Sequence, residues 1–162
     1  MFHLDRMDVS ILDALQADAR LSNQRLADKV GLSASACWRR VKSLEEAGVI
    51  DRYVTLLQPE QVNLGVTAYL QLSLENHQPE TMAAFDRLIE EVPEITECYS
   101  MSGQDDYLIR ISTATLADYE ALLGRHFLRA SGLRTANTSF VLKRKKYTTA
   151  LPIRPSPLRG AP

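Results

Sequence analysis

One short helical pattern carries an aromatic side chain and a cluster of cationic ones, which are Trp38, Arg39, Arg40 and Lys42. Lysine and arginine neutralise backbone phosphates, and arginine also forms paired hydrogen bonds to the edge of guanine. A short helix with positive charge on its outward side fits the major groove of DNA. The residue types and their spacing therefore indicate recognition of double-stranded DNA.

Two helices must precede this one to position it. Asp5 in the N-cap position and Asp8 in the capping-box position predict a first helix over residues 6–17. Ser22 predicts the cap of a second helix. Gly31 ends that helix, because a residue with a β-carbon resists the left-handed conformation that a helix end requires.

The third helix is predicted to begin at Ser33 and to end at Gly48. Its buried side is predicted from i, i+4, i+7 spacing and comprises Cys37, Val41 and Leu44. The positions predicted to point away from the core are Ala34, Ser35, Trp38, Arg39 and Lys42. The tight turn before this helix predicts a helix-turn-helix, and the strand formers at residues 49–57 predict a wing beside it.

The candidate DNA-binding residues extend beyond the cationic cluster. Serine hydroxyls and the N-terminus of the third helix can bond phosphates. Secondary candidates come from the second helix and from the wing. The full set is Gln24, Ser33, Ser35, Trp38, Arg39, Arg40, Lys42 and Arg52.

Two members of this set have a structural alternative. Trp38 either packs against sugar and backbone or covers the edge of the helix bundle. Arg40 borders the buried stripe, so it either contacts DNA or forms a salt bridge to Glu45 or Asp51.

From Val66 the hydrophobic pattern becomes βαββαβ. The predicted elements are a strand over 66–74, a helix between Pro79 and Pro93, strands over 95–101 and 107–112, a helix over 116–127 and a strand over 135–145. This order is that of the ferredoxin-like fold, in which two helices cover one face of an antiparallel sheet. The uncovered face, expected to carry Phe140 and Leu142, must be buried, and self-association is the simplest way.

The chain is therefore predicted to be of the α+β class. The predicted domains are a winged helix-turn-helix over residues 1–57, a linker over 58–65, a ferredoxin-like domain over 66–151 and a flexible tail over 152–162. The tail has too much proline and too few core residues to fold alone. We expect it to be mobile or to lie over a neighbour.

Composition limits the class of protein. A chain of 162 residues, 45% hydrophobic and 24% charged, fits one ordinary domain or two small ones. No apolar run approaches the roughly 20 residues of a membrane helix, and the N-terminus lacks a secretory pattern, so we expect a cytoplasmic protein. Cys37 and Cys98 lie in element interiors, which favours buried thiols over a disulfide or a metal site. No metal or cofactor is expected.

The net charge of −1 conceals a separation of charge along the chain. Acidic residues dominate 66–127, whereas every charged side chain after Arg134 is basic. Segregated charge is typical of segments with different partners. The basic run Lys143–Lys146 is either a solvated strand end, part of an assembly surface or an additional DNA contact.

Several segments together resemble one known family, and they are Leu4–Asp8, Leu26–Ser33, Arg39–Ile50 and Ser102–Tyr107. In this order they resemble the leucine-responsive/asparagine-responsive (Lrp/AsnC, feast/famine) transcription regulators over about residues 4–151. The resemblance implies a winged helix-turn-helix joined to an effector-binding domain that forms homodimers and often octamers. Such proteins bind amino acids between subunits and thereby regulate promoters. The basic run departs from the family, whose last strand is acidic to mixed, and residues 146–152 are similar to cysteine-detoxification regulators.

The resemblance implies an effector site at the loop between the two middle strands. Gly103 lets backbone N–H groups approach a carboxylate, and Asp105 or Asp106 can receive an α-ammonium, with Asp106 favoured by its position before Tyr107. The implied set is Ser100, Met101, Ser102, Gly103, Gln104, Asp105, Asp106 and Tyr107, with Thr138, Ser139 and Phe140 from a neighbouring subunit. Apart from the resemblance, residues 102–106 have an ordinary turn composition. Candidate effectors are cysteine, leucine, methionine and aromatic amino acids such as tryptophan or kynurenine.

Two other functions compete with this one. The ferredoxin-like fold hosts many enzymes, but none of His3, His77 and His126 has an evident acid–base or nucleophile partner, so we expect no catalysis. An architectural DNA-packing protein without an effector would assemble in the same way and leave the Gly103 loop unused. Footprinting with and without amino acids separates that protein from a regulator.

Overall fold

The computed structural model describes residues 2–128 and 132–156, and the chain forms two compact units. One unit comprises Met1–Thr55 and Lys146–Pro162, and the other comprises Leu56–Lys145. Each has its own hydrophobic core. Within the described ranges, no helix combines the length and the apolar character needed to cross a membrane.

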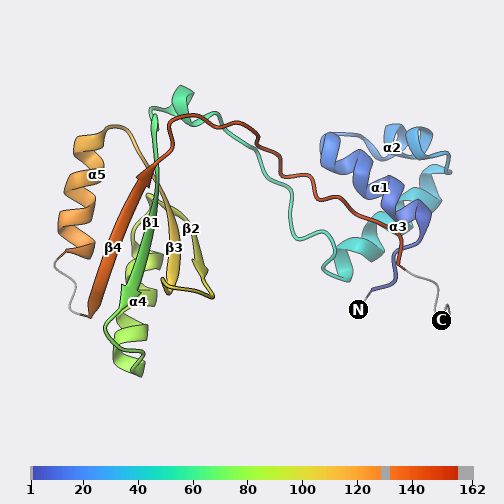
Figure 1. The fold of residues 1–162 in the computed structure, drawn as a ribbon. Coiled ribbons are helices and arrows are strands. Elements are labelled where there is room, and N and C mark those ends of the chain that lie inside the picture. The colour runs from blue at the N-terminus through green and yellow to red at the C-terminus, as the bar shows by residue number, and fades with distance from the viewer. Residues whose placement is uncertain (1, 129–131, 157–162) are drawn as a thin grey trace. The chain divides into compact units, whose positions relative to one another are not determined.

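The first unit contains α1 (Arg6–Ala17), α2 (Asn23–Val30) and α3 (Ala34–Glu46), as Figure 1 shows. The predicted helices are confirmed. Side chains from each of them close the core, with Ile11, Ala27, Cys37 and Leu44 fully buried. Two details differ from the prediction, because Ala34 packs against this core and Val41 is only partly buried.

The helix ends follow the capping residues of the sequence. The carboxylate of Asp5 accepts the N–H of Asp8 at 2.8 Å, and the N–H of Asp5 donates to the carboxylate of Asp8 at 3.1 Å. This is the predicted capping box. Gly31 ends α2 with φ of 72°, and the space around it is open, so the backbone angle alone requires glycine.

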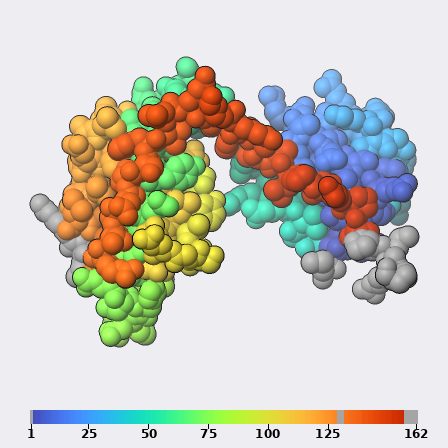
Figure 2. Space-filling view, in the orientation of Figure 1, coloured from blue at the N-terminus to red at the C-terminus, as the bar shows by residue number. Residues whose placement is uncertain are grey.

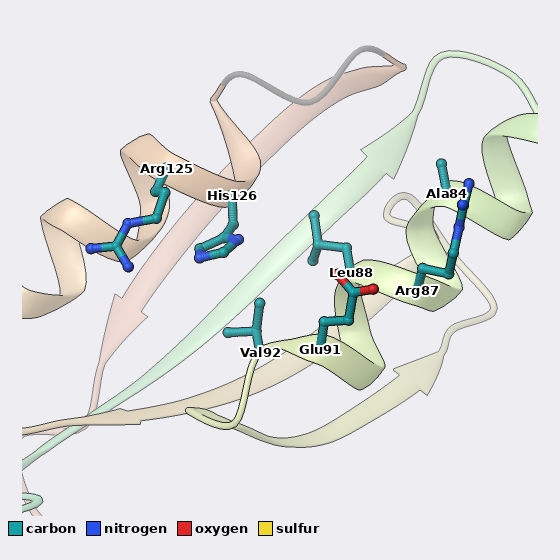
Figure 3. A pocket seen from close by; sticks show the side chains of 7 residues that line it. All are labelled: Ala84, Arg87, Leu88, Glu91, Val92, Arg125 and His126. Atoms are coloured by element: carbon teal, nitrogen blue, oxygen red, sulfur yellow. The ribbon is translucent and has the colours of Figure 1, made fainter.

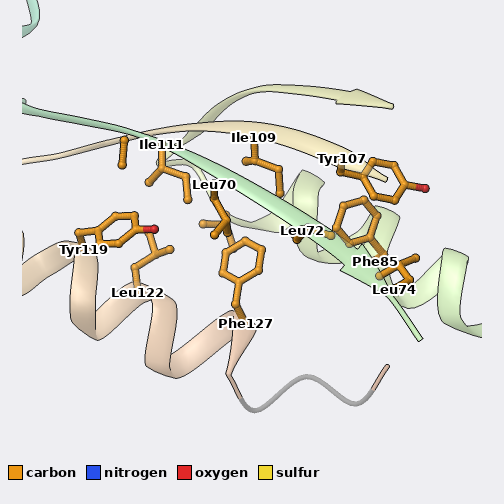
Figure 4. Packing of buried hydrophobic residues seen from close by; sticks show 12 residues of the cluster. Leu70, Leu72, Leu74, Phe85, Tyr107, Ile109, Ile111, Tyr119, Leu122 and Phe127 are labelled. Atoms are coloured by element: carbon orange, nitrogen blue, oxygen red, sulfur yellow. The ribbon is translucent and has the colours of Figure 1, made fainter. Parts of the chain in front are cut away.

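The second unit contains η1 (Pro59–Val62), β1 (Val66–Leu74), α4 (Pro79–Glu91), β2 (Ile95–Ser100), β3 (Tyr107–Thr113), α5 (Leu116–Leu122) with a following π-helical turn (Leu123–Phe127), and β4 (Leu133–Phe140). The strands of the described chain form an antiparallel sheet in the order β2-β3-β1-β4. In Figure 4, Phe85 of α4 and Tyr119 and Leu122 of α5 face the buried side chains of β1 and β3. The predicted ferredoxin-like α+β arrangement is confirmed.

The last strand differs from its prediction. It spans Leu133–Phe140 rather than 135–145, because β1 begins at Val66 and offers no partner beyond the bond from the N–H of Val141 to the carbonyl of Thr67. The basic run Lys143–Lys146 therefore follows the strand instead of belonging to it.

The expected position of Phe140 was also wrong. Phe140 pairs with buried Ala68, and its ring lies 5.1 Å from that of Tyr119 on α5, so it belongs to the face that the helices cover. The strand registers leave the uncovered face to a mixed set, which includes Tyr69, Gln71, Tyr99, Leu108, Arg110, Asn137 and Ser139. Leu142 is almost fully exposed and lies after the strand.

The segment predicted to form the wing is neither helix nor strand in the described chain. Its apolar side chains Tyr53, Val54, Leu56 and Leu57 are exposed. These residues have strand-forming side chains, but no described segment pairs with them. A strand requires a hydrogen-bonding neighbour as well as suitable side chains.

The tail predicted over residues 152–162 is described in part. Its residues up to Ser156 are described and lie on the surface of the first unit (Figure 2). There Ile153 contacts the core and the N–H of Ser156 donates to the carbonyl of Leu4. The remaining residues of the predicted tail, 157–162, lie outside the described residues.

Candidate DNA-binding surface and effector site

The outward side of α3 presents the aromatic and cationic residues that the sequence singled out. Trp38 is 53% exposed, and the ammonium of Lys42 lies 5.0 Å from the centroid of its ring. Lys42 also lies 3.7 Å from the carboxylate of Glu46. Arg39 is exposed and forms no ion pair within the described residues. Its guanidinium is therefore available to an external anion.

Arg40 has a different environment. Its Nη1 lies 2.8 Å from the carboxylate of Asp5 and 2.7 Å from that of Asp8, so it joins the middle of α3 to the start of α1. Arg40 does form a salt bridge, which was one of its two predicted roles, but its partners are Asp5 and Asp8 and not the predicted Glu45 or Asp51. The hydrogen bond from the Asp8 N–H, together with Arg40, lowers the pKa of Asp5, and the two carboxylates raise that of Arg40.

The side chains of the secondary candidates Gln24 and Arg52 bond to residues close by in the sequence. The amide of Gln24 donates to Asp28 at 2.8 Å, and Arg52 lies 3.1 Å from Asp51. The hydroxyl of Ser33 accepts the N–H of Ala36 at 3.3 Å and so caps α3. The remaining serine of the set, Ser35, lies 3.4 Å from the Ser33 hydroxyl and is exposed.

Beside this surface lies a cleft of about 450 Å³ between α3 and the ends of α1 and α2. Trp38 and Tyr53 line it together with Leu15, Leu26 and Val41. Trp38 thus lies at the edge of the helix bundle, and about half of its side chain is also exposed to solvent. Tyr53 is half exposed, and the partial burial of its ring in this cleft, together with the hydrogen bond that its hydroxyl donates to Glu45, raises its pKa to about 12, so the hydroxyl stays protonated.

The loop between β2 and β3 is tied to the end of β1 through Asp106. One oxygen of its carboxylate accepts the N–H of Leu74 at 2.8 Å, and the other lies 3.5 Å from the imidazole of His77. The loop backbone adds bonds from the Asp106 N–H to Leu72 and from the Met101 N–H to Asp106. Gly103 has φ of 150° and open space around it, so its backbone can be approached closely.

The sheet register separates the two halves of the predicted effector set. Tyr107 pairs with Leu72 at one end of β1, whereas Phe140 pairs with Ala68, which is about 13 Å away at 3.3 Å per residue. Thr138 is engaged with α5, because its hydroxyl lies 2.6 Å from that of Tyr119. Within one chain, the 100–107 segment and residues 138–140 therefore do not converge.

Sequence reasoning missed several polar contacts. The uncovered sheet face holds an ion pair of 2.7 Å between Arg110 and Glu97, and the Nε of Arg110 is buried without a partner among the described residues. The second roles of Asp5 and Asp8 as partners of Arg40 were also missed. Such pairs depend on which strands and helices become neighbours, and no local pattern of the sequence carries that information.

A separate cleft of about 350 Å³ lies in the helical layer of the second unit. Figure 3 shows Arg125 and His126 on one side of it and Arg87, Leu88 and Glu91 of α4 on the other. None of the predicted effector residues lines this cleft. Among the described residues, no group of His, Cys, Asp and Glu could hold a metal ion, and both cysteines are free thiols.

Two family models match this chain, one over the helix-turn-helix and one over the ferredoxin-like domain. A winged helix-turn-helix DNA-binding model matches residues 4–51, and an Lrp/AsnC ligand binding domain model matches residues 67–151. The DNA-binding transcriptional activator DecR of Escherichia coli K12 is 37% identical over 150 residues, which cover 93% of this chain and 99% of that protein.

Solved structures agree along nearly the whole chain. A transcriptional regulator from Neisseria meningitidis, in complex with L-methionine, has a TM-score of 0.89 at 37% identity, covering 92% of this chain and 96% of that one. An AsnC family transcriptional regulator from Agrobacterium tumefaciens has a TM-score of 0.87 at 41% identity, covering 92% and 97%.

Proposed function

The chain belongs to the Lrp/AsnC family of DNA-binding transcriptional regulators, and from this premise we propose that a small amino acid held between its subunits changes its binding to promoter DNA. The observation that carries the proposal is the exposed, unpaired Arg39 on α3 of a helix-turn-helix whose chain continues into a ligand-binding domain. The function thus joins a DNA-reading unit to a sensing unit.

In the proposed DNA complex, Arg39 and Lys42 neutralise phosphates or reach base edges, and Ser33 and Ser35 bond phosphates at the start of α3. Arg40 acts differently. Because it already neutralises Asp5 and Asp8, its main role is to fix the angle between α3 and α1. Gln24 and Arg52 supply secondary contacts to the phosphate backbone.

The proposed effector site is completed by a second subunit. Residues 100–107 of one chain supply the loop, in which Gly103 admits the ligand carboxylate and Asp106 attracts its ammonium. Thr138, Ser139 and Phe140 of another chain supply the other half, since the register separates the two halves within one chain. The proposed protein is therefore a homodimer or a larger assembly such as an octamer, and its uncovered sheet face, which carries Tyr99 and Leu108, is the proposed contact surface.

The experiment that tests this function is a thermal-shift screen of the purified chain against single amino acids, followed by titration of promoter DNA with each amino acid that gives a shift. Methionine is tested first, because the solved relative from Neisseria is an L-methionine complex. Cysteine, leucine and the aromatic amino acids follow. The expected result is a stabilising shift and a changed DNA affinity with at least one of them. Equal protection of unrelated DNA sequences with and without the amino acids would instead support an architectural DNA-packing protein.

A further inference from the structure

The C-terminal residues Leu151–Ser156, here called the C-terminal strap, are held at both ends by the first unit. The side-chain amide of Gln16 brackets the backbone of Leu151, donating to its carbonyl at 3.1 Å and accepting its N–H at 2.6 Å. At the other end, the N–H of Ser156 donates to the carbonyl of Leu4 at 2.8 Å, and the Ser156 hydroxyl accepts the N–H of Leu4 at 2.9 Å. Between these ends, Ile153 packs against the core of the unit.

The strap matches α1 in length and runs in the opposite direction. Leu4 precedes α1 and Gln16 lies in its last turn, so these anchors are about 18 Å apart at 1.5 Å per residue. The five steps from Leu151 to Ser156 span about 17 Å in an extended chain. The strap therefore runs antiparallel along the whole of α1, and Figure 2 shows its atoms on the surface of this unit.

Its composition favours this docked form. Pro152 and Pro155 fix φ and remove backbone donors, so an extended conformation costs less entropy. The N–H groups of Leu151 and Ser156 donate to Gln16 and Leu4, whereas that of Ile153 donates to the Leu151 carbonyl within the strap. An undocked strap would lose the acceptors of Leu151 and Ser156.

The strap gives the first unit a second covalent connection to the second unit. One connection follows α3 into the segment that begins at Leu56, and the other runs from the end of β4 at Phe140 through residues 141–150 to the strap. The second connection starts at Thr138–Phe140, which belong to the proposed effector site. A unit attached by two connections has less freedom to reorient than a unit attached by one.

We propose that the C-terminal strap couples the effector site to the DNA-binding unit. A change at the end of β4 reaches α1 through residues 141–150 and the Gln16 and Leu4 anchors, and it biases the orientation of α3. This inference rests on the proposed function. The strap determines how much an amino acid changes the DNA affinity, whereas the residues of α3 provide the DNA contacts themselves.

The test uses the full chain with Gln16→Ala, a second variant that ends at Ala150, and Ser10→Ala as the matched control on the same helix. Ser10 is exposed, and among the described residues its hydroxyl bonds only within α1, to the carbonyl of Arg6. Hydrogen exchange at Leu151 and Ser156 measures docking, and DNA titration with and without an equimolar mixture of the twenty L-amino acids measures coupling. Sedimentation shows whether each variant keeps the wild-type assembly.

Gln16→Ala is expected to raise exchange at Leu151 at least tenfold and to reduce the effect of the amino-acid mixture on DNA affinity at least threefold. DNA affinity without amino acids is expected to stay within twofold of wild type, and Ser10→Ala to match wild type in both measurements. The chain ending at Ala150 is expected to lose the amino-acid effect as well. Wild-type exchange at Leu151 as fast as in an unstructured peptide would overturn the docked strap.

The outcomes distinguish this inference from the function on which it rests. If wild type responds to the mixture and both strap variants respond equally, the coupling is overturned and the proposed function stands. If wild type shows slow exchange at the strap but no response to amino acids, the proposed function is overturned, and the coupling with it.

Discussion

At the residue scale, Arg40 is the side chain on which the geometry of the helix-turn-helix depends most directly. It neutralises two carboxylates that also cap α1, and the side chain of Asp8 is only 8% exposed. A nearly buried carboxylate without its cation is costly. The same two carboxylates thus serve the start of one helix and the position of another.

Replacing Arg40 with alanine is expected to destabilise the first unit by about 1–3 kcal/mol, a range reduced from that of a fully buried pair because Arg40 and Asp5 are partly exposed. Trp38 is the only tryptophan of the chain, so its fluorescence in urea reports the unfolding of this unit. Arg40→Lys should recover part of the loss. Unchanged unfolding in Arg40→Ala would show that the ion pairs contribute nothing to stability.

The pH dependence follows from Asp5. Its pKa is lowered in the folded chain, so its contribution to stability is present above the ordinary carboxylate pKa and is lost as the pH falls through the lowered value, below about pH 4. The Asp8 N–H is the largest cause of the shift, so Arg40→Ala should reduce this acid-side loss without removing it. Urea unfolding at pH 7 and pH 3, followed by Trp38 fluorescence, measures both.

Arg39 tests the DNA-binding surface itself. Because its guanidinium is exposed and unpaired within the described residues, Arg39→Ala should leave the fold intact and weaken promoter binding. It should also reduce the slope of log affinity against log salt by about one. Arg87→Ala, an exposed arginine of the second unit, is the control. An unchanged affinity and slope for Arg39→Ala would exclude this residue from the interface.

Asp106 requires two variants, because its carboxylate both holds the loop and is proposed to bind ammonium. Asp106→Asn keeps an acceptor for the Leu74 N–H and removes the charge, whereas Asp106→Ala removes both. Both variants should lose the thermal shift caused by the amino acid and still bind DNA, and only Asp106→Ala should also lower the melting temperature without ligand. A full ligand shift in Asp106→Asn would contradict the proposed charge pair.

At the element scale, the turn between α2 and α3 depends on one backbone angle. Gly31→Ala places a β-carbon at φ of 72° and is expected to cost about 1–2 kcal/mol in the first unit, since no neighbouring atom adds a clash. Gly31→Asn should cost less, because asparagine tolerates this conformation better. Urea unfolding followed by Trp38 fluorescence measures both variants. Equal stability of Gly31→Ala and wild type would show that the turn relaxes to another angle.

The elements that the sequence predicted well are those that local signals define. Asp5, Ser22 and Ser33 marked the starts of the helices, and the first strand predicted over residues 66–74 coincides with β1. The errors concern features that need a partner. β4 ends where β1 ceases to pair with it, the 49–57 segment has no strand partner among the described residues, and Phe140 takes its face from the register with Ala68.

For the candidate site, residue types were predictable and their partners were not. The exposure of Trp38, Arg39 and Lys42 follows from helical periodicity around Cys37 and Leu44. The pairing of Arg40 with Asp5 and Asp8 joins positions more than 30 residues apart, and only the packing of α1 on α3 brings them together. The bonds from Asp106 to Leu74 and from Gln16 to Leu151 arise in the same way.

At the scale of the whole molecule, the uncovered face of the sheet decides whether the proposed effector site can exist. The helices cover one face only, and the other face presents Leu108 among Gln71, Tyr99 and the Arg110–Glu97 pair. The Nε of Arg110 is a buried donor on this face without a partner among the described residues. Because the proposed site takes residues 138–140 from a neighbour, assembly and sensing should fail together.

Leu108→Lys tests this dependence by placing a charge on the uncovered face, where it would be buried in an interface without a partner. The expected result is a shift in sedimentation from the assembled form toward the 18.2 kDa chain, together with loss of the amino-acid thermal shift. Trp38 fluorescence should still show a folded first unit. Leu116→Lys is the matched control, because Leu116 is 55% exposed at the start of α5, on the covered side of the sheet. A monomeric Leu108→Lys chain that kept the full thermal shift would show that one subunit suffices for the effector site.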